Sequence, residues 1–134
     1  MKATISRALL DRLRNESAAA GDAEICGLLL GRDAAIEEAV AIPNAAPEAK
    51  SGFLLDPKRH IDALRDARRS GKAVIGHYHS HPSCDPFPSP TDAVEAREEG
   101  VYWLILAAGA SRLWLSRRRG QVLGSFDLVE MAIF

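Results

Sequence analysis

The stretch Ala73-Val74-Ile75-Gly76-His77-Tyr78-His79-Ser80-His81-Pro82 holds three of the chain's four histidines, at alternate positions. Its apolar start predicts a central strand from Ala73 to His79. Successive side chains of a strand point to opposite faces, so His77, His79 and His81 should share one face. Two such imidazoles can converge on one Zn²⁺ ion at about 2.0–2.1 Å. A lone surface histidine usually has no ligand, but three at this spacing favour a metal site.

The segment Ser89-Pro90-Thr91-Asp92 supplies the best candidate for a third, oxygen ligand. The proline-rich run from Pro82 to Pro90 predicts a loop that can bring Asp92 back to the strand end. These residues also have a purely structural explanation, because a serine cap, a proline and an acid at the third position begin a helix without catalysis. The two interpretations are compatible, since a helix N-terminus favours a carboxylate and could hold Asp92 in place.

A wider pattern surrounds these residues. His79-Ser80-His81 is followed by seven residues, Ser89, two residues and Asp92, and Glu24 stands before the apolar run from Ile25 to Leu30. This arrangement resembles the signature of the JAMM/MPN+ zinc metalloproteases. The resemblance runs through most of the chain, and no part of the motif is missing, unlike in members that have lost ligands and serve as scaffolds. Without the downstream motif, Glu24 would be an ordinary carboxylate at a strand end.

The resemblance implies a role for each residue of the motif. His79, His81 and Asp92 would hold one Zn²⁺ per chain, with a bound water in the fourth position, as in catalytic zinc sites. Glu24 would take a proton from that water and pass it to the leaving amine. Ser89 would help to stabilise the oxyanion. The resemblance therefore implies a zinc metalloprotease.

The substrates of the family are peptide or isopeptide bonds that follow the C-terminal Gly-Gly of ubiquitin and ubiquitin-like proteins. This chain is too compact for long inserted segments that grip ubiquitin. It is most similar to the small stand-alone prokaryotic members, which are associated with ubiquitin-like sulfur carriers. The implied partner is thus a ubiquitin-like or sulfur-carrier protein, and its identity and the leaving group stay open.

Three further residues lie near the predicted site. His77 is one step deeper in the strand than the ligands, and we interpret it as a supporting or core residue. Two cysteines are too few for a disulfide framework. Cys26 lies in an apolar strand and is predicted to be a buried thiol. Cys84 lies in the proline-rich loop and could compete as a ligand, but Asp92 fills that position better.

The composition indicates a single domain, residues 1–134, long enough to bury an ordinary core. Seventeen Lys and Arg against eighteen Asp and Glu give a net charge of −1, so no overall field attracts nucleic acid or an anionic membrane. Arg117-Arg118-Arg119 is predicted to be a solvated hairpin turn. No apolar run reaches the roughly eighteen residues of a membrane span. The charged N-terminus does not resemble a signal peptide, so we expect a cytoplasmic protein.

Helices and strands alternate, which predicts an α/β domain with a mixed β-sheet flanked by helices. The resemblance implies the same fold, related to the cytidine-deaminase layout. The first helix is expected to bury Ile5, Leu9 and Leu13. The second is expected to begin at the cap Asp56, to end at Gly71 and to bury Ile61, Leu64 and Ala67 or Arg68. The third is expected to run from Thr91 to Glu99. The predicted strands are Ile25–Leu30, Ile36–Ile42, Ala73–His79, Val101–Ala107, Arg112–Leu115 and Gln121–Leu128, and Phe53-Leu54-Leu55 is expected to be short and extended. The segment from Asn44 to Ser51 is predicted to be a loop, and the apolar segment from Leu128 to Phe134 could pack on the sheet or in a homodimer.

Three other classes of protein share parts of this pattern. A zinc nucleoside deaminase needs His-x-Glu followed by Pro-Cys-x-x-Cys, and the chain has neither. RadC-type proteins, which are linked to DNA, carry a similar His-x-His-Pro-Ser stretch, but Glu24-Ile25-Cys26-Gly27 and the nearly neutral charge favour the peptidase. A protein-binding module that uses the same face, with zinc structural or absent, stays open.

Overall fold

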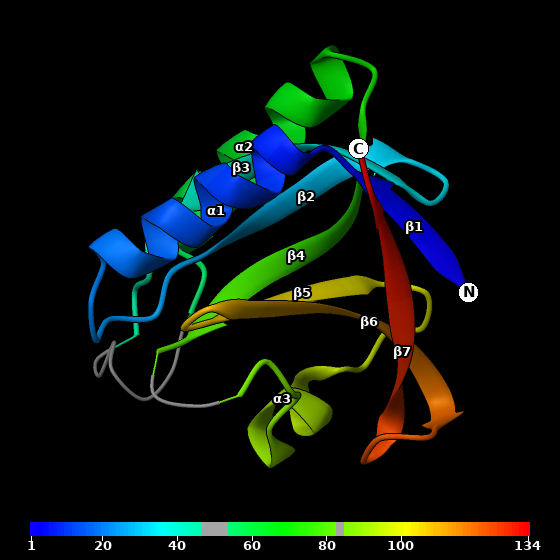
Figure 1. The fold of residues 1–134 in the computed structure, drawn as a ribbon. Helices are drawn as coiled ribbons and strands as arrows, with labels where there is room; N and C mark the ends of the chain where they lie inside the picture. The colour runs from blue at the N-terminus through cyan, green and yellow to red at the C-terminus, as the bar shows by residue number, and fades with distance from the viewer. Residues whose placement is uncertain (47–53, 83–84) are drawn as a thin grey trace.

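The structure, a computed structural model, describes residues 1–46, 54–82 and 85–134. Its strands form one mixed sheet that closes on itself in the order β1-β3-β2-β4-β5-β6-β7 (Figure 1). The elements in chain order are β1 (Lys2–Ile5), α1 (Arg7–Ala19), β2 (Cys26–Arg32), β3 (Ala35–Ile42), α2 (Pro57–Arg69), β4 (Ala73–His81), α3 (Pro90–Glu95), β5 (Tyr102–Ala107), β6 (Ala110–Gly120) and β7 (Gly124–Ile133). The predicted α/β fold with a mixed sheet is confirmed, although its closure was not predicted.

The strands β2 and β4 lie at the centre of the sheet. β2 runs antiparallel to both β3 and β4, whereas β4 and β5 are parallel. Cys26 lies opposite His79, and Leu28 lies opposite His77. Residues opposite each other in an antiparallel pair project from the same face. The histidines therefore share a face with Cys26 and Leu28, as the alternation predicted.

Two helices cover the two faces of this central region. Leu10 and Leu13 of α1 belong to the same buried cluster as Leu29 and Tyr78. Ala63 and Ala67 of α2 pack instead with residues of β2 and β3, among them Leu28. α1 and α2 lie across β2 and β3 in Figure 1, and α3 lies apart from both. Since Leu28 shares a face with His77, α2 covers the face that carries the histidines.

The first two helices differ from prediction in which residues they bury. Ile5 is fully buried, but it belongs to β1, because Ser6 caps α1 by accepting a hydrogen bond from the amide of Leu9 at 3.1 Å. In α2 the cap at Asp56 and the proline at the first position are as predicted. Of the residues predicted to be buried, Ala67 is buried as expected, at 3% exposed, but Ile61 and Leu64 are 50% and 39% exposed. The small residues Ala63 and Ala67 face the sheet and let the helix lie close to it.

The C-terminal half forms a longer meander than predicted. β6 continues through Arg117–Arg119, so these residues do not form the predicted hairpin turn. Their exposed side chains lie between Ser116 and Gly120, where the regular pairing of β6 with β7 is interrupted. α3 ends at Glu95, not at Glu99. The apolar C-terminal segment pairs in parallel with β1, so it packs on its own sheet.

Part of the predicted loop lies outside the described residues. Of the segment from Asn44 to Ser51, the structure describes residues 44–46, and Asn44 forms an isolated antiparallel bridge with Leu55. Phe53 and Cys84 also lie outside the described residues. No helix within the described ranges is long and apolar enough to cross a membrane.

Gly27 is required where β2 passes over the ring of Tyr78. A Cβ at this position would collide with the carbonyl oxygen of Val40 and with the Tyr78 ring. We expect Gly27→Ala to lower the free energy of unfolding by about 1–3 kcal/mol, as other overpacked cores do. Urea unfolding of this variant, beside the exposed Ala41→Ser as a control, measures the effect. An unchanged midpoint for Gly27→Ala would show that the two strands are not packed this closely.

Candidate metal centre

Three predicted ligands meet at the end of β4. His79 and His81 project from this strand, and their Nε2 atoms are 3.0 Å apart. α3 brings in Asp92, whose Oδ1 lies 3.4 Å from Nε2 of His79 and whose Oδ2 lies 3.4 Å from Nε2 of His81. The three donor atoms lie within 4.8 Å of one another. The side chain of His79 is fully buried, and those of His81 and Asp92 are 12% and 6% exposed.

The arrangement of these donors fits a metal ion. Two imidazole nitrogens and one carboxylate oxygen form a donor set typical of catalytic zinc sites. Two nitrogens bound to one tetrahedral ion at about 2.0–2.1 Å would lie about 3.3 Å apart, which is close to the 3.0 Å between the Nε2 atoms of His79 and His81. Both rings thus present Nε2 to the same point.

The protonation of the three groups is set by burial and by their mutual contacts. Burial lowers the pKa of His79, against the opposing effect of Asp92. Burial also acts to lower the pKa of His81, but hydrogen bonding to Asp92 and the Asp92 charge outweigh it, so the pKa is raised. Burial acts to raise the pKa of Asp92, but its hydrogen bonds to both histidines outweigh it and lower the pKa. Asp92 is therefore ionised beside the two imidazoles.

The helix cap fixes the orientation of Asp92. The Ser89 amide donates to Oδ2 of Asp92 at 2.8 Å, and the Asp92 amide donates to Oγ of Ser89 at 3.1 Å. This reciprocal pair is a capping box, with Pro90 at the first helical position. The structural explanation is confirmed, and the same cap turns the carboxylate toward the histidines. The Ser89 hydroxyl accepts this bond and keeps its own proton for donation.

Contacts that sequence reasoning missed support the ligands from behind. Nδ1 of His81 lies 3.3 Å from the carbonyl oxygen of Asp85, which favours a proton on Nδ1 and leaves Nε2 for a metal. Trp114 donates from its indole Nε1 to the carbonyl oxygen of Pro86 at 3.0 Å, and its ring packs 5.2 Å from that of Phe87. Trp114 thus anchors the loop at Pro86, which lies 28 residues earlier in the chain. No local sequence pattern indicates a contact at this separation.

Glu24 lies at the entrance of β2, beside the same cluster. The Ser80 amide donates to the Ile25 carbonyl at 3.1 Å, and the Ile25 amide donates to Oγ of Ser80 at 2.9 Å. These bonds continue the pairing of β2 with β4 beyond Cys26 and bring Glu24 level with His81. The Glu24 residue is 8% exposed. Burial raises the pKa of its carboxyl group; the charge of His81 lowers it and that of Asp92 raises it.

His77 lies behind the ligands and packs on an aromatic ring. Its ring centroid is 4.2 Å from that of Trp103 in an edge-on contact, and the His79 ring is 5.9 Å from the same indole. Burial lowers the pKa of His77 to about 4, so it is neutral at pH 7. Among the described residues, the cluster of possible metal donors contains His79, His81 and Asp92 and does not include His77.

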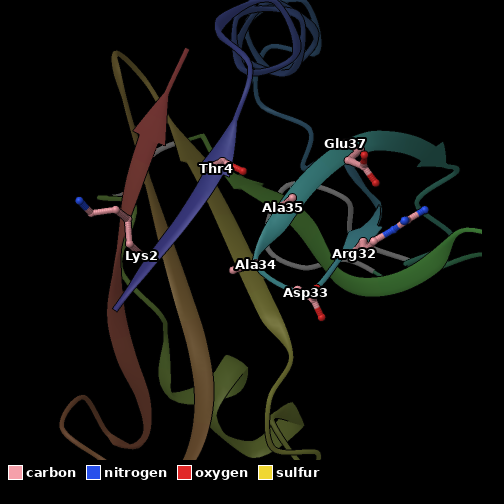
Figure 2. Close-up of a pocket in the computed structure, with 7 residues that line it drawn as sticks. All are labelled: Lys2, Thr4, Arg32, Asp33, Ala34, Ala35 and Glu37. Atoms are coloured by element: carbon pink, nitrogen blue, oxygen red, sulfur yellow. The ribbon is translucent and has the colours of Figure 1, made fainter.

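A shallow pocket lies at the other end of β2 (Figure 2). Its volume is about 540 Å³, and it opens between β1 and the β2–β3 hairpin. The residues that line it are Lys2, Thr4, Arg32, Asp33, Ala34, Ala35 and Glu37. Arg32 is the last residue of β2, whereas Cys26, the first, faces His79. The pocket carries both signs of charge and is separate from the candidate metal centre.

Cys26 is a buried thiol, as predicted. It is 2% exposed, and its Sγ lies 3.5 Å from the Ile42 carbonyl oxygen. Burial and, to a smaller extent, the charge of Glu24 raise its pKa to about 11, so the thiol stays protonated at pH 8. In the Cys84→Ser variant we expect no reaction with Ellman's reagent at pH 8 until the protein is unfolded in guanidinium, when one thiol reacts. Rapid reaction of the folded variant would contradict this burial.

Known proteins resemble this chain in sequence and in fold. The family model for prokaryotic homologs of the JAB domain matches residues 6–119. A desampylase from Haloferax volcanii is 40% identical over 91 residues, which cover 65% of this chain and 66% of the relative. A probable TtuB-protein conjugate cleaving protease from Thermus thermophilus is 34% identical over 93 residues, which cover 69% of this chain and 62% of the relative. The matched part of this chain thus spans slightly less than two thirds of the length of each of these two relatives.

Solved structures share the fold over nearly the whole chain. A protein from Desulfitobacterium hafniense superposes with a TM-score of 0.84 at 23% identity, covering 98% of this chain and 92% of the other. A JAB1/MPN domain protein from Archaeoglobus fulgidus gives a TM-score of 0.63 at 21% identity, covering 98% of each chain. These likenesses confirm the JAMM/MPN fold. The family match covers most of the sequence, so the chain belongs to the prokaryotic homologs of the JAB domain.

Proposed function

We propose that this chain is a zinc-dependent metalloprotease that cleaves the peptide or isopeptide bond after the C-terminal Gly-Gly of a ubiquitin-like or sulfur-carrier protein. The observation that carries the proposal is the convergence of His79, His81 and Asp92 on one point beside the buried carboxyl group of Glu24. The names of the relatives, a desampylase and a conjugate-cleaving protease, support the same reaction class. The catalytic unit would be the single domain 1–134.

The residues of the cluster would divide the work between them. His79, His81 and Asp92 would hold the zinc ion. When bound, zinc polarises a carbonyl group and lowers the pKa of a bound water to about 7. Glu24 would accept a proton and deliver it to the leaving amine, and its raised pKa brings it nearer to neutral pH, where a carboxyl group can do both. The Ser89 hydroxyl would donate a hydrogen bond to the oxyanion.

The ligand assignment predicts the metal content of three variants. The wild type should hold about one zinc ion per chain after zinc reconstitution and desalting, measured by elemental mass spectrometry. His79→Ala, His81→Ala and Asp92→Ala should each lose most of it, because two donors cannot hold the ion as three do. His60→Ala, which removes the histidine of α2, is the matched control and should keep its zinc. Full occupancy in any of the three ligand variants would show that the ligand set is wrong.

The role of Glu24 predicts a different result for Glu24→Gln. This variant should keep its zinc and lose about 10²–10⁴-fold in kcat, the usual contribution of a general acid–base. The substrates for this test are Gly-Gly-ended ubiquitin-like proteins joined by an isopeptide bond to a fluorescent lysine peptide. Glu37→Gln, at an exposed position on β3, is the control and should cleave at the wild-type rate.

Two other outcomes would change the proposal. Loss of zinc in Glu24→Gln would make Glu24 a ligand and overturn its assigned role. A wild-type protein that binds such a carrier but cleaves none of the conjugates would favour a binding module instead.

A further inference from the structure

One peptide group beside the metal centre is held at both ends by side chains. It joins Glu24 to Ile25. Its carbonyl oxygen, that of Glu24, accepts a hydrogen bond from Nδ2 of Asn44 at 2.9 Å. Its N–H, that of Ile25, donates to Oγ of Ser80 at 2.9 Å. Asn44 follows the end of β3 and Ser80 belongs to β4, so the group is clamped between the two strands that flank β2.

The backbone ladders of the sheet do not reach Glu24. The pairing of β2 with β3 ends at Cys26 opposite Ile42, and its pairing with β4 ends at Cys26 opposite His79. On the β4 side, the bonds between Ile25 and Ser80 extend the contact. On the β3 side, the hydrogen bond from Asn44 Nδ2 to the Glu24 carbonyl has this role. The direction of the Glu24 side chain depends on the peptide plane that Asn44 and Ser80 hold.

The Asn44 amide is itself fixed in orientation. Its Oδ1 accepts hydrogen bonds from the amides of Ala46 and Leu54, both at 3.0 Å. These two donors occupy the oxygen, so the NH₂ group must point to the Glu24 carbonyl, an acceptor. The bridge between Asn44 and Leu55 holds the backbone of the same residue. Asn44 therefore ties Glu24 to two backbone segments that are distant in sequence from it.

We infer that Asn44 is a positioning residue, whose side-chain amide holds the peptide group between Glu24 and Ile25 and thereby aims the Glu24 carboxyl group at the centre formed by His79, His81 and Asp92. The inference rests on the proposed function of Glu24. No feature of the sequence indicates this role, because Asn44 is there the first residue of a polar loop. A misplaced acid–base group costs rate without removing the metal, so Asn44 acts on turnover and not on zinc binding.

Asn44→Asp tests this inference, because it replaces the donor NH₂ by an oxygen and keeps the acceptor for Ala46 and Leu54. We expect kcat to fall about 10-fold or more, as small misplacements of catalytic groups do, with KM within about twofold and zinc content unchanged. Hydrogen exchange followed by NMR should show faster exchange of the Ile25 amide and unchanged protection of Ala46 and Leu54. Asn15→Asp, which adds the same charge at an exposed position of α1, is the control and should change none of these.

A second variant separates a positioning role from a general structural one. In the Glu24→Gln background, Asn44→Asp should cause no further loss of rate, because the group that Asn44 aims is already absent. A further loss there, zinc loss in Asn44→Asp, or a wild-type kcat would each overturn the inference.

The two proposals fail in different ways. Wild-type turnover by Glu24→Gln would refute the proposed function, whereas wild-type turnover by Asn44→Asp beside an inactive Glu24→Gln would refute the role of Asn44 alone. If the wild type cleaves no conjugate, the Ile25 amide decides: unchanged exchange in Asn44→Asp overturns the clamp, and faster exchange supports it.

Discussion

The antiparallel register of β2 on β4 is the constraint on which the candidate centre depends. It places Cys26 opposite His79, and the hydrogen bonds between Ile25 and Ser80 carry the same register one step further. A shift by one residue would turn every side chain of β2 to the other face. The close packing of Gly27 on Tyr78 opposes such a shift, since any larger side chain would collide there. Glu24 thus comes beside His81 from a distant part of the chain.

The charged and polar groups of the cluster are each held by hydrogen bonds or by pairing with a neighbour. A buried carboxylate is costly unless it is paired and hydrogen-bonded. Asp92 meets this condition through the two imidazoles and the Ser89 amide. His81 is held from behind by the Asp85 carbonyl. Contacts within the protein therefore hold the three candidate donors close together.

Much of the fold could be predicted because its signals are local. The caps at Asp56 and Ser89, the apolar run of β2 and the alternating histidines of β4 each act within a few residues. The predictions were wrong where a residue's structure depends on a partner that is distant in sequence. The four residues of β1 form a strand because β3 and β7 lie on either side, so the sheet closes. α2 leaves Ile61 and Leu64 exposed because Ala63 and Ala67 are the residues that pack against β2 and β3.

The sequence by itself determined which residues are candidate metal donors, because His79, His81 and Asp92 lie close together along a single strand, loop and helix start. Only the tertiary structure decided how Glu24 is held there. Asn44 donates to the Glu24 carbonyl and the Ile25 amide donates to Ser80, so the segment before β2 is tied to the residues that follow β3 and to β4. Such contacts leave no periodic trace in the chain. Local chemistry is readable from sequence, whereas the orientation of a side chain depends on neighbours that folding alone brings together.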